Sequence, residues 1–149
     1  MRAGANRPRV REKMRTAFVW KDSYTVKVMA MDNQHRKLFD LINEFSEAVH
    51  SGPGKDVVGD VLLRLIDYTR CHFSAEEKLM ERLKYAGLPT HRGEHRYLIE
   101  KVQAFKKEFD TGNINIAPEL LTFLQKWLTS HIQVVDQKYS DFMNGHGVH

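Results

Sequence analysis

The stretch HRGEHRYLIEKVQAFKKEF, residues 91–109, carries the pattern that decides the fold. Its apolar and imidazole side chains recur every three or four residues, at His91, His95, Leu98, Val102, Phe105 and Phe109. An α-helix turns once in about 3.6 residues, so this spacing places those side chains on one face. The stretch is therefore predicted to form an amphipathic helix, and the buried face of that helix begins with two histidines.

Three further segments show the same helical spacing, and short breaks separate them. The breaks are SGPGK (51–55), AGLPT (86–90) and TGNINIAP (111–118). Asp32 or Asn33 is expected to cap the first helix, and Thr90 the third. Four amphipathic helices with short connections predict an all-α fold, an antiparallel up-down-up-down four-helix bundle. Residues 17–31 are apolar without a clean period, which predicts an extended N-terminal lead-in.

Composition and charge are those of one globular domain. The chain has 149 residues, 42% of them hydrophobic, and a formal net charge of +4. Residues 1–15 hold six basic side chains against Glu12, and the rest is nearly neutral. We expect a basic, disordered arm at 1–15, the bundle over 16–144 and a flexible tail at 145–149. An arm for nucleic acid or a membrane surface is disfavoured because no aromatics are interleaved, and Met14 is an alternative start.

The protein is expected to be cytoplasmic. Cys71 is the sole cysteine, so an intramolecular disulfide is excluded. No apolar run approaches the roughly 20 residues of a membrane span, and no signal-peptide pattern follows the N-terminus. We expect a protein with no membrane span and no nucleic-acid partner, and a monomer.

Histidines interrupt the apolar stripes where leucine is expected. An unpaired buried imidazole costs roughly 1–3 kcal/mol, so several in one core need a shared partner. A metal ion is such a partner. Of the eight histidines, five lie on core faces, namely His35, His72, His91, His95 and His131.

Two carboxylates complete this set. Glu76 follows His72 by four residues, which places both on one helical face. Asp136 follows His131 by five residues, about 140° around an ideal α-helix. Asp136 therefore needs a bent-back side chain or a local π-bulge to reach a metal that His131 holds. Seven ligands exceed the four of one tetrahedral zinc and suit two octahedral metals bridged by carboxylates, for which iron is favoured.

Two other kinds of metal site share parts of this pattern. HRGEH, residues 91–95, also fits H-x-x-E-H, the zinc-peptidase pattern in which Glu94 would activate water. A zinc peptidase needs a third ligand, room for water and a strand that aligns the substrate, and the sequence supplies no such strand. The ferritin-like di-iron site needs two E-x-x-H pairs, and the chain has only Glu47–His50.

The ordered motifs DNQHRKLFDLIN, HFSAEEKLM, HRGEH and WLTSHIQVVDQKY resemble those of the hemerythrin family, over residues 18–143. The resemblance implies a non-haem di-iron centre with a bridging oxo or hydroxo group, and dioxygen as its ligand. His91, His95 and His131 would hold one iron. His35 and His72 would hold the second, with Glu76 and Asp136 bridging. The second iron keeps an open position for dioxygen.

The family lines its oxygen pocket with apolar residues near the ligands. The corresponding positions here are Leu38, Phe73, Trp127, Ile132 and Val134. Tyr139, one turn after Asp136, is expected to hydrogen-bond to a ligand.

The function implied is reversible dioxygen binding for transport, storage or delivery to an oxygen-consuming enzyme, and not catalysis. Two alternatives stay open at this point. One is an oxygen, redox or iron sensor that acts through a partner. The other is a di-iron peroxidase or nitric-oxide scavenger, which would need access for substrate and protons.

Overall fold

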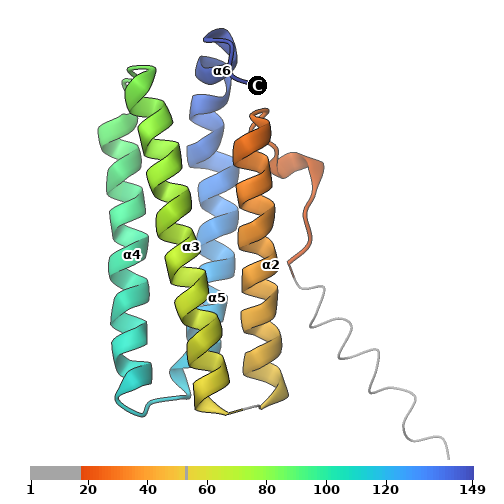
Figure 1. Ribbon diagram of the computed structural model, residues 1–149, viewed down its shortest axis with the longest axis vertical. Helices are drawn as coiled ribbons and strands as arrows, with labels where there is room; N and C mark the ends of the chain where they lie inside the picture. Colours follow the sequence, from red (N-terminus) through yellow and green to blue (C-terminus); the bar gives the residue numbers. More distant parts are fainter. Residues whose placement is uncertain (1–17, 53) are drawn as a thin grey trace, which may run out of the picture.

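The structure is a computed structural model that describes residues 18–52 and 54–149, and its helices form one bundle (Figure 1). Three long helices come first along the chain, and a fourth rod is built from three consecutive helical pieces. The elements are η1 (Asp22–Tyr24), α2 (Met29–Ser51), α3 (Lys55–Arg82), α4 (Leu88–Asp110), α5 (Ile116–Ser130), η2 (His131–Asp136) and α6 (Gln137–Gly145). The described residues contain no strand, and the predicted all-α antiparallel four-helix bundle is confirmed. The predicted arm at 1–15 and Met14 lie outside the described residues.

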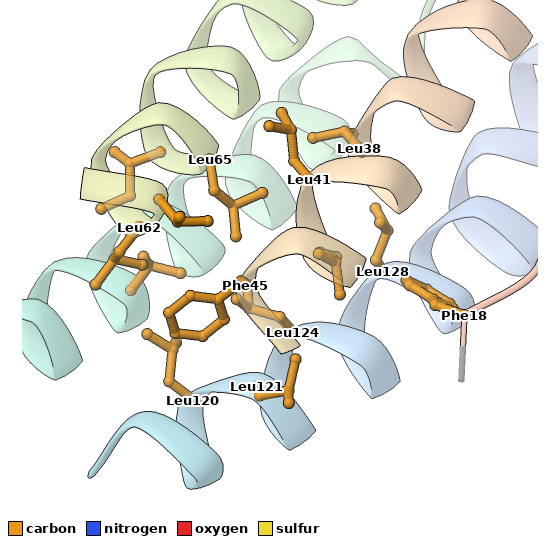
Figure 2. Close-up of a cluster of buried hydrophobic side chains, with 14 of the residues drawn as sticks. Phe18, Leu38, Leu41, Phe45, Leu62, Leu65, Leu120, Leu121, Leu124 and Leu128 are labelled. Atoms are coloured by element: carbon orange, nitrogen blue, oxygen red, sulfur yellow. The ribbon is translucent and has the colours of Figure 1, made fainter. Parts of the chain in front are cut away.

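The core forms where the four apolar stripes meet. α2 packs against α3 and α5, and α4 packs against the same two helices. Figure 2 shows leucines from α2, α3 and α5 closing around the ring of Phe45, which is completely buried. Burial of one such side chain contributes roughly 1.5–3 kcal/mol. This leucine-rich region therefore supplies stability away from the histidines.

Two helix starts differ from the sequence-based prediction. α2 begins at Met29, and Asp32 lies inside its first turn without capping it. The Asp32 carboxylate instead accepts hydrogen bonds from the backbone N–H of Val26, at 2.9 Å, and from the Thr25 hydroxyl. α4 begins at Leu88, with Gly87 before it, so the Thr90 cap is also wrong. Asp32 is thus an anchor for the lead-in.

The lead-in is fixed over the end of the bundle that holds the histidines. The side-chain amide of Gln137 donates to the Thr25 carbonyl at 2.8 Å, and that of Asn144 donates to the Lys27 carbonyl at 2.9 Å. Val26 and Val28 are buried in a second apolar cluster, with Met31, Met80, Leu88, Tyr139 and Met143. The lead-in therefore closes this end of the core. The flexibility expected of residues 145–149 stays a prediction.

None of the helices in residues 18–52 and 54–149 is both long and apolar enough to span a bilayer.

Adjacent leucines on α3 give a matched test of this core. Leu62 is 1% exposed and Leu63 is 45% exposed. We expect Leu62→Ala to lower the free energy of unfolding by about 2–5 kcal/mol, because it opens a cavity. Leu63→Ala should change it by less than about 0.5 kcal/mol. Urea unfolding of both variants without metal measures the difference, and equal effects would contradict the described packing.

Candidate metal centre

All seven predicted ligands meet in the interior of the bundle. α2 supplies His35, α3 supplies His72 and Glu76, and α4 supplies His91 and His95. His131 and Asp136 are the first and last residues of η2. None of the seven is more than 3% exposed. Every helix of the bundle thus contributes to one buried polar cluster, as the histidine-interrupted stripes predict.

A π-helical segment brings His131 and Asp136 together. η2 covers the six residues from His131 to Asp136. In a π-helix the backbone bonds join residues five apart, so residues at that spacing share a face. Oδ1 of Asp136 lies 3.1 Å from Nε2 of His131. Of the two solutions predicted for this spacing, the structure adopts the π-helical one.

The ligand atoms divide into two unequal groups. Within each group the donor atoms lie within 4.8 Å of one another, close enough for one metal ion. The larger group is Glu76, His91, His95, His131 and Asp136, and the smaller is His35, His72 and Glu76. We call them the three-histidine group and the two-histidine group.

Each carboxylate turns one oxygen toward each group. Oε1 of Glu76 lies 2.8 Å from Nε2 of His91 and 3.1 Å from Nε2 of His95. Oε2 of Glu76 lies 3.5 Å from Nε2 of His72 and 3.6 Å from Nε2 of His35. This is the disposition of a carboxylate that bridges two metal ions.

Asp136 repeats the arrangement from the opposite side. Its Oδ1 lies 3.0 Å from Nε2 of His91, in the three-histidine group. Its Oδ2 lies 3.2 Å from Nε2 of His35, in the two-histidine group. Both carboxylates therefore span the two groups.

Unsatisfied polar atoms show that the cluster fits metal ions. Nε2 of His35, His95 and His131 and both carboxylate oxygens of Asp136 are buried without a hydrogen-bond partner. Several of these atoms lie near 3 Å from an opposite charge, but their directions do not make hydrogen bonds. Buried polar atoms rarely stay unpaired. Nitrogen and oxygen donors aimed at a shared point are what a divalent metal ion satisfies.

Two residues that the sequence reasoning missed orient the histidines. Nδ1–H of His72 donates to Oε1 of Gln34 at 2.6 Å, and Nδ1–H of His95 donates to Oε2 of Glu77 at 2.7 Å. Each bond leaves Nε2 free of hydrogen and directed inward, as metal binding requires. Both residues stand next to a ligand in the sequence, Gln34 before His35 and Glu77 after Glu76. That adjacency was the available signal.

Tyr139 is a hydrogen-bond donor to a ligand, although the acceptor is on another helix. Its hydroxyl donates to Oε2 of Glu76 at 2.6 Å. Burial, and next the negative charge of Glu76, raise the pKa of Tyr139 well above its ordinary value. The phenol therefore stays protonated and holds the carboxylate in place.

Charges inside the cluster compensate one another when no metal is bound. Burial lowers the pKa of His35 and His91, but the close approach of the Asp136 and Glu76 carboxylates outweighs burial and raises each pKa to about 9. Burial dominates at His72, whose pKa falls to about 4. Burial opposes ionisation of Glu76, yet the facing histidines hold its pKa well below the ordinary value. Without metal, the positive charges of protonated His35 and His91 thus balance the negative charges of the two carboxylates.

Two of the five predicted pocket residues contact histidines of the cluster, and two more are buried in the apolar core. The Phe73 ring stacks on His95 at 3.7 Å between centroids, and the Trp127 ring stacks on His131 at 4.3 Å. Leu38 and Ile132 are buried in the main apolar cluster. Val134 is 57% exposed, so the prediction that it lines a dry pocket is wrong. The π-helical winding of η2 turns this position outward.

Glu94 has no place in the cluster. It belongs to neither ligand group, although it lies between His91 and His95 in the sequence. The zinc-peptidase alternative needs this carboxylate beside the metal. The geometry therefore disfavours it.

Removal of one histidine tests the division into two groups. His35→Ala takes a donor from the two-histidine group alone, so we expect the metal-free protein to bind one Co²⁺ ion per chain tightly instead of two. His50→Ala removes an exposed histidine and should leave both. Titration followed by cobalt absorption gives the stoichiometry. Equal loss of both ions in His35→Ala would contradict the grouping.

Metal binding should depend on pH through His35 and His91. A histidine ligand must be neutral, and with a pKa of about 9 both are protonated at neutral pH in the metal-free protein. The apparent Co²⁺ affinity should therefore rise with pH up to about 9, with protons released on binding. Calorimetry in buffers of different ionisation enthalpy measures that release. An affinity independent of pH between about 6 and 9 would contradict it.

Known proteins resemble this chain in both sequence and fold. The family model described as Hemerythrin HHE cation binding domain matches residues 26–142. The chain is 34% identical to a bacteriohemerythrin of Stenotrophomonas maltophilia, with 87% of this chain and 83% of that one covered. It is 35% identical to a bacteriohemerythrin of Clostridium acetobutylicum, over 83% of this chain and 99% of that one.

A solved structure gives the same result. The crystal structure of a wild-type hemerythrin superposes with a TM-score of 0.78 at 30% identity, over 83% of this chain and 95% of that one. The matched range contains all seven residues of the buried cluster. On these grounds, the chain belongs to the hemerythrin family.

Proposed function

We propose that this protein binds dioxygen reversibly at a non-haem, carboxylate-bridged di-iron centre. The observation that carries the proposal is the buried pair of unequal ligand groups joined by two shared carboxylates. His91, His95 and His131 would hold one iron, and His35 and His72 the other. Glu76 and Asp136 would bridge them. The pair, when bound, would supply the two electrons that dioxygen accepts.

The inequality of the two groups determines where a small ligand can bind. Three histidines and two carboxylate oxygens give the three-histidine group five donors, whereas the two-histidine group has four. An octahedral ion takes six ligands. If a bridging oxygen took one position at each ion, a metal held by the two-histidine group would keep one position open. That position is our candidate for dioxygen.

The surroundings favour binding over turnover. Phe73 and Trp127 cover the histidines with aromatic faces, and the cluster itself excludes solvent. The one hydroxyl in contact with a ligand, on Tyr139, already donates to Glu76. Peroxide reduction needs a proton delivered to the bound oxygen atoms. Within the described residues we find no acid free to give one, which supports a carrier or store over a peroxidase.

Cycles of oxygenation test the proposal. The iron-loaded protein is reduced without oxygen, exposed to oxygen and then purged, while the visible spectrum and iron content are followed. We expect two irons per chain and a colour that appears with oxygen and fades on purging. One iron per chain, or irreversible oxidation in the first cycle, would overturn the proposal. A partner bound only in the oxygenated state would favour a sensor instead.

A further inference from the structure

The two ligand groups differ in the charge of the side chain that accepts a hydrogen bond from the outer nitrogen of one of their histidines. The outer nitrogen of His95, in the three-histidine group, donates to the carboxylate of Glu77 at 2.7 Å. The outer nitrogen of His72, in the two-histidine group, donates to the amide oxygen of Gln34 at 2.6 Å. Among the five histidines of the buried cluster, the described residues provide a hydrogen bond to Nδ1 only at His72 and His95. One group thus has an anionic acceptor, and the other a neutral one.

Glu77 is also tied to the protein surface. Its second oxygen, Oε1, accepts a hydrogen bond from Nε of Arg92 at 3.2 Å. Arg92 also donates through a terminal nitrogen to Glu81, again at 3.2 Å. The side chain of Glu77 is 24% exposed, and that of Arg92 is 42% exposed. A line of alternating charge therefore runs from His95 outward, between α3 and α4.

A groove of about 470 Å³ follows this line on the surface. Phe73 and His95 lie at its inner side, and Glu77, Arg92 and Glu100 also line it. The Phe73 ring stacks on the His95 ring at this groove. Glu77 is therefore the polar link between this surface and a ligand of the three-histidine group.

The charge of Glu77 has a direct chemical effect on His95. A hydrogen bond to an ionised acceptor is roughly twice as strong as one to a neutral acceptor. It draws the Nδ1 proton away from the ring and makes Nε2 a better donor to a metal. A better donor stabilises the more highly charged state of that metal. Arg92 opposes this by placing positive charge on the other oxygen of Glu77.

We propose that Glu77 is a positioning residue that makes the three-histidine position the tighter and more easily oxidised of the two, and that Arg92 limits this effect. Gln34 leaves the two-histidine position without such a charge. The redox part rests on the proposed di-iron function, whereas the binding part requires only that a divalent metal occupies the cluster.

Metal binding tests the first part without iron or oxygen. Glu77→Gln keeps an acceptor for His95 but removes its charge, so we expect the tighter Co²⁺ affinity to fall about 10-fold to 100-fold. Gln34→Glu should strengthen the weaker site. Glu100→Gln removes a carboxylate from the same groove that touches no ligand, and should change neither affinity. Melting temperatures of the metal-free variants verify that each is folded.

The outcomes separate the inference from the function. If the unmodified protein binds fewer than two Co²⁺ ions, the di-iron proposal fails. If it binds two and Glu77→Gln binds both as tightly, the role of Glu77 is overturned. The tighter Co²⁺ affinity could also fall in Glu77→Ala and stay unchanged in Glu77→Gln. That result would show that only the position of His95 matters, and it would overturn the charge argument.

Reduction potentials of the iron-loaded protein test the second part. Arg92→Gln removes the opposing positive charge, so its potential should lie below that of the unmodified protein, and that of Glu77→Gln should lie above. The order Arg92→Gln, unmodified, Glu77→Gln is the expected result. Equal potentials, or the reverse order, would overturn it. Anaerobic redox titration followed by the visible spectrum gives all three values, whether or not dioxygen binds reversibly.

Discussion

The structure depends on the burial of two carboxylates, Glu76 and Asp136, in the middle of a helical bundle. Both are completely buried. An unpaired charge in such a place costs several kcal/mol, and breaking a buried pair costs about 3–5 kcal/mol. Histidines from every helix face these two groups at distances of 2.8 to 3.6 Å. The bundle is thus assembled around a charge that no single helix could bury alone.

Because the buried carboxylates need histidines around them, the two ends of the bundle differ in composition. One end holds the histidines, closed by the lead-in through Asp32, Gln137 and Asn144. The other end is a leucine core around Phe45 (Figure 2). His35 and Phe45 are ten residues apart on α2, about 15 Å along the axis. The apolar end can therefore supply folding free energy while the polar end stays specialised for binding.

The fold and the meeting of the seven candidate ligands could be predicted because both follow from the spacing of residues along single helices. His91 and His95 share a face whatever the neighbours do, and the five-residue step from His131 to Asp136 already required either a bent-back side chain or a π-helical turn. The prediction that Val134 lines the pocket was wrong because the π-helical turn moves this residue outward, whereas the prediction assumed a regular α-helix. The prediction that Asp32 caps the first helix was wrong because an aspartate near a helix start can cap the helix or bind a distant backbone group, and the sequence does not distinguish the two.

The partners of the histidines could not be predicted, since they depend on how helices are rotated against each other. The segment HRGEH contains a glutamate of its own, Glu94, yet the carboxylate that holds His95 is Glu77, from α3. The helical period explains the choice, because Glu94 directly precedes His95 and points away by about 100°. An acid on the facing helix approaches the outer nitrogen without disturbing the inner one. His72 and His95 therefore each take their second partner from a neighbouring helix, and the charge of that partner differs between the two ligand groups.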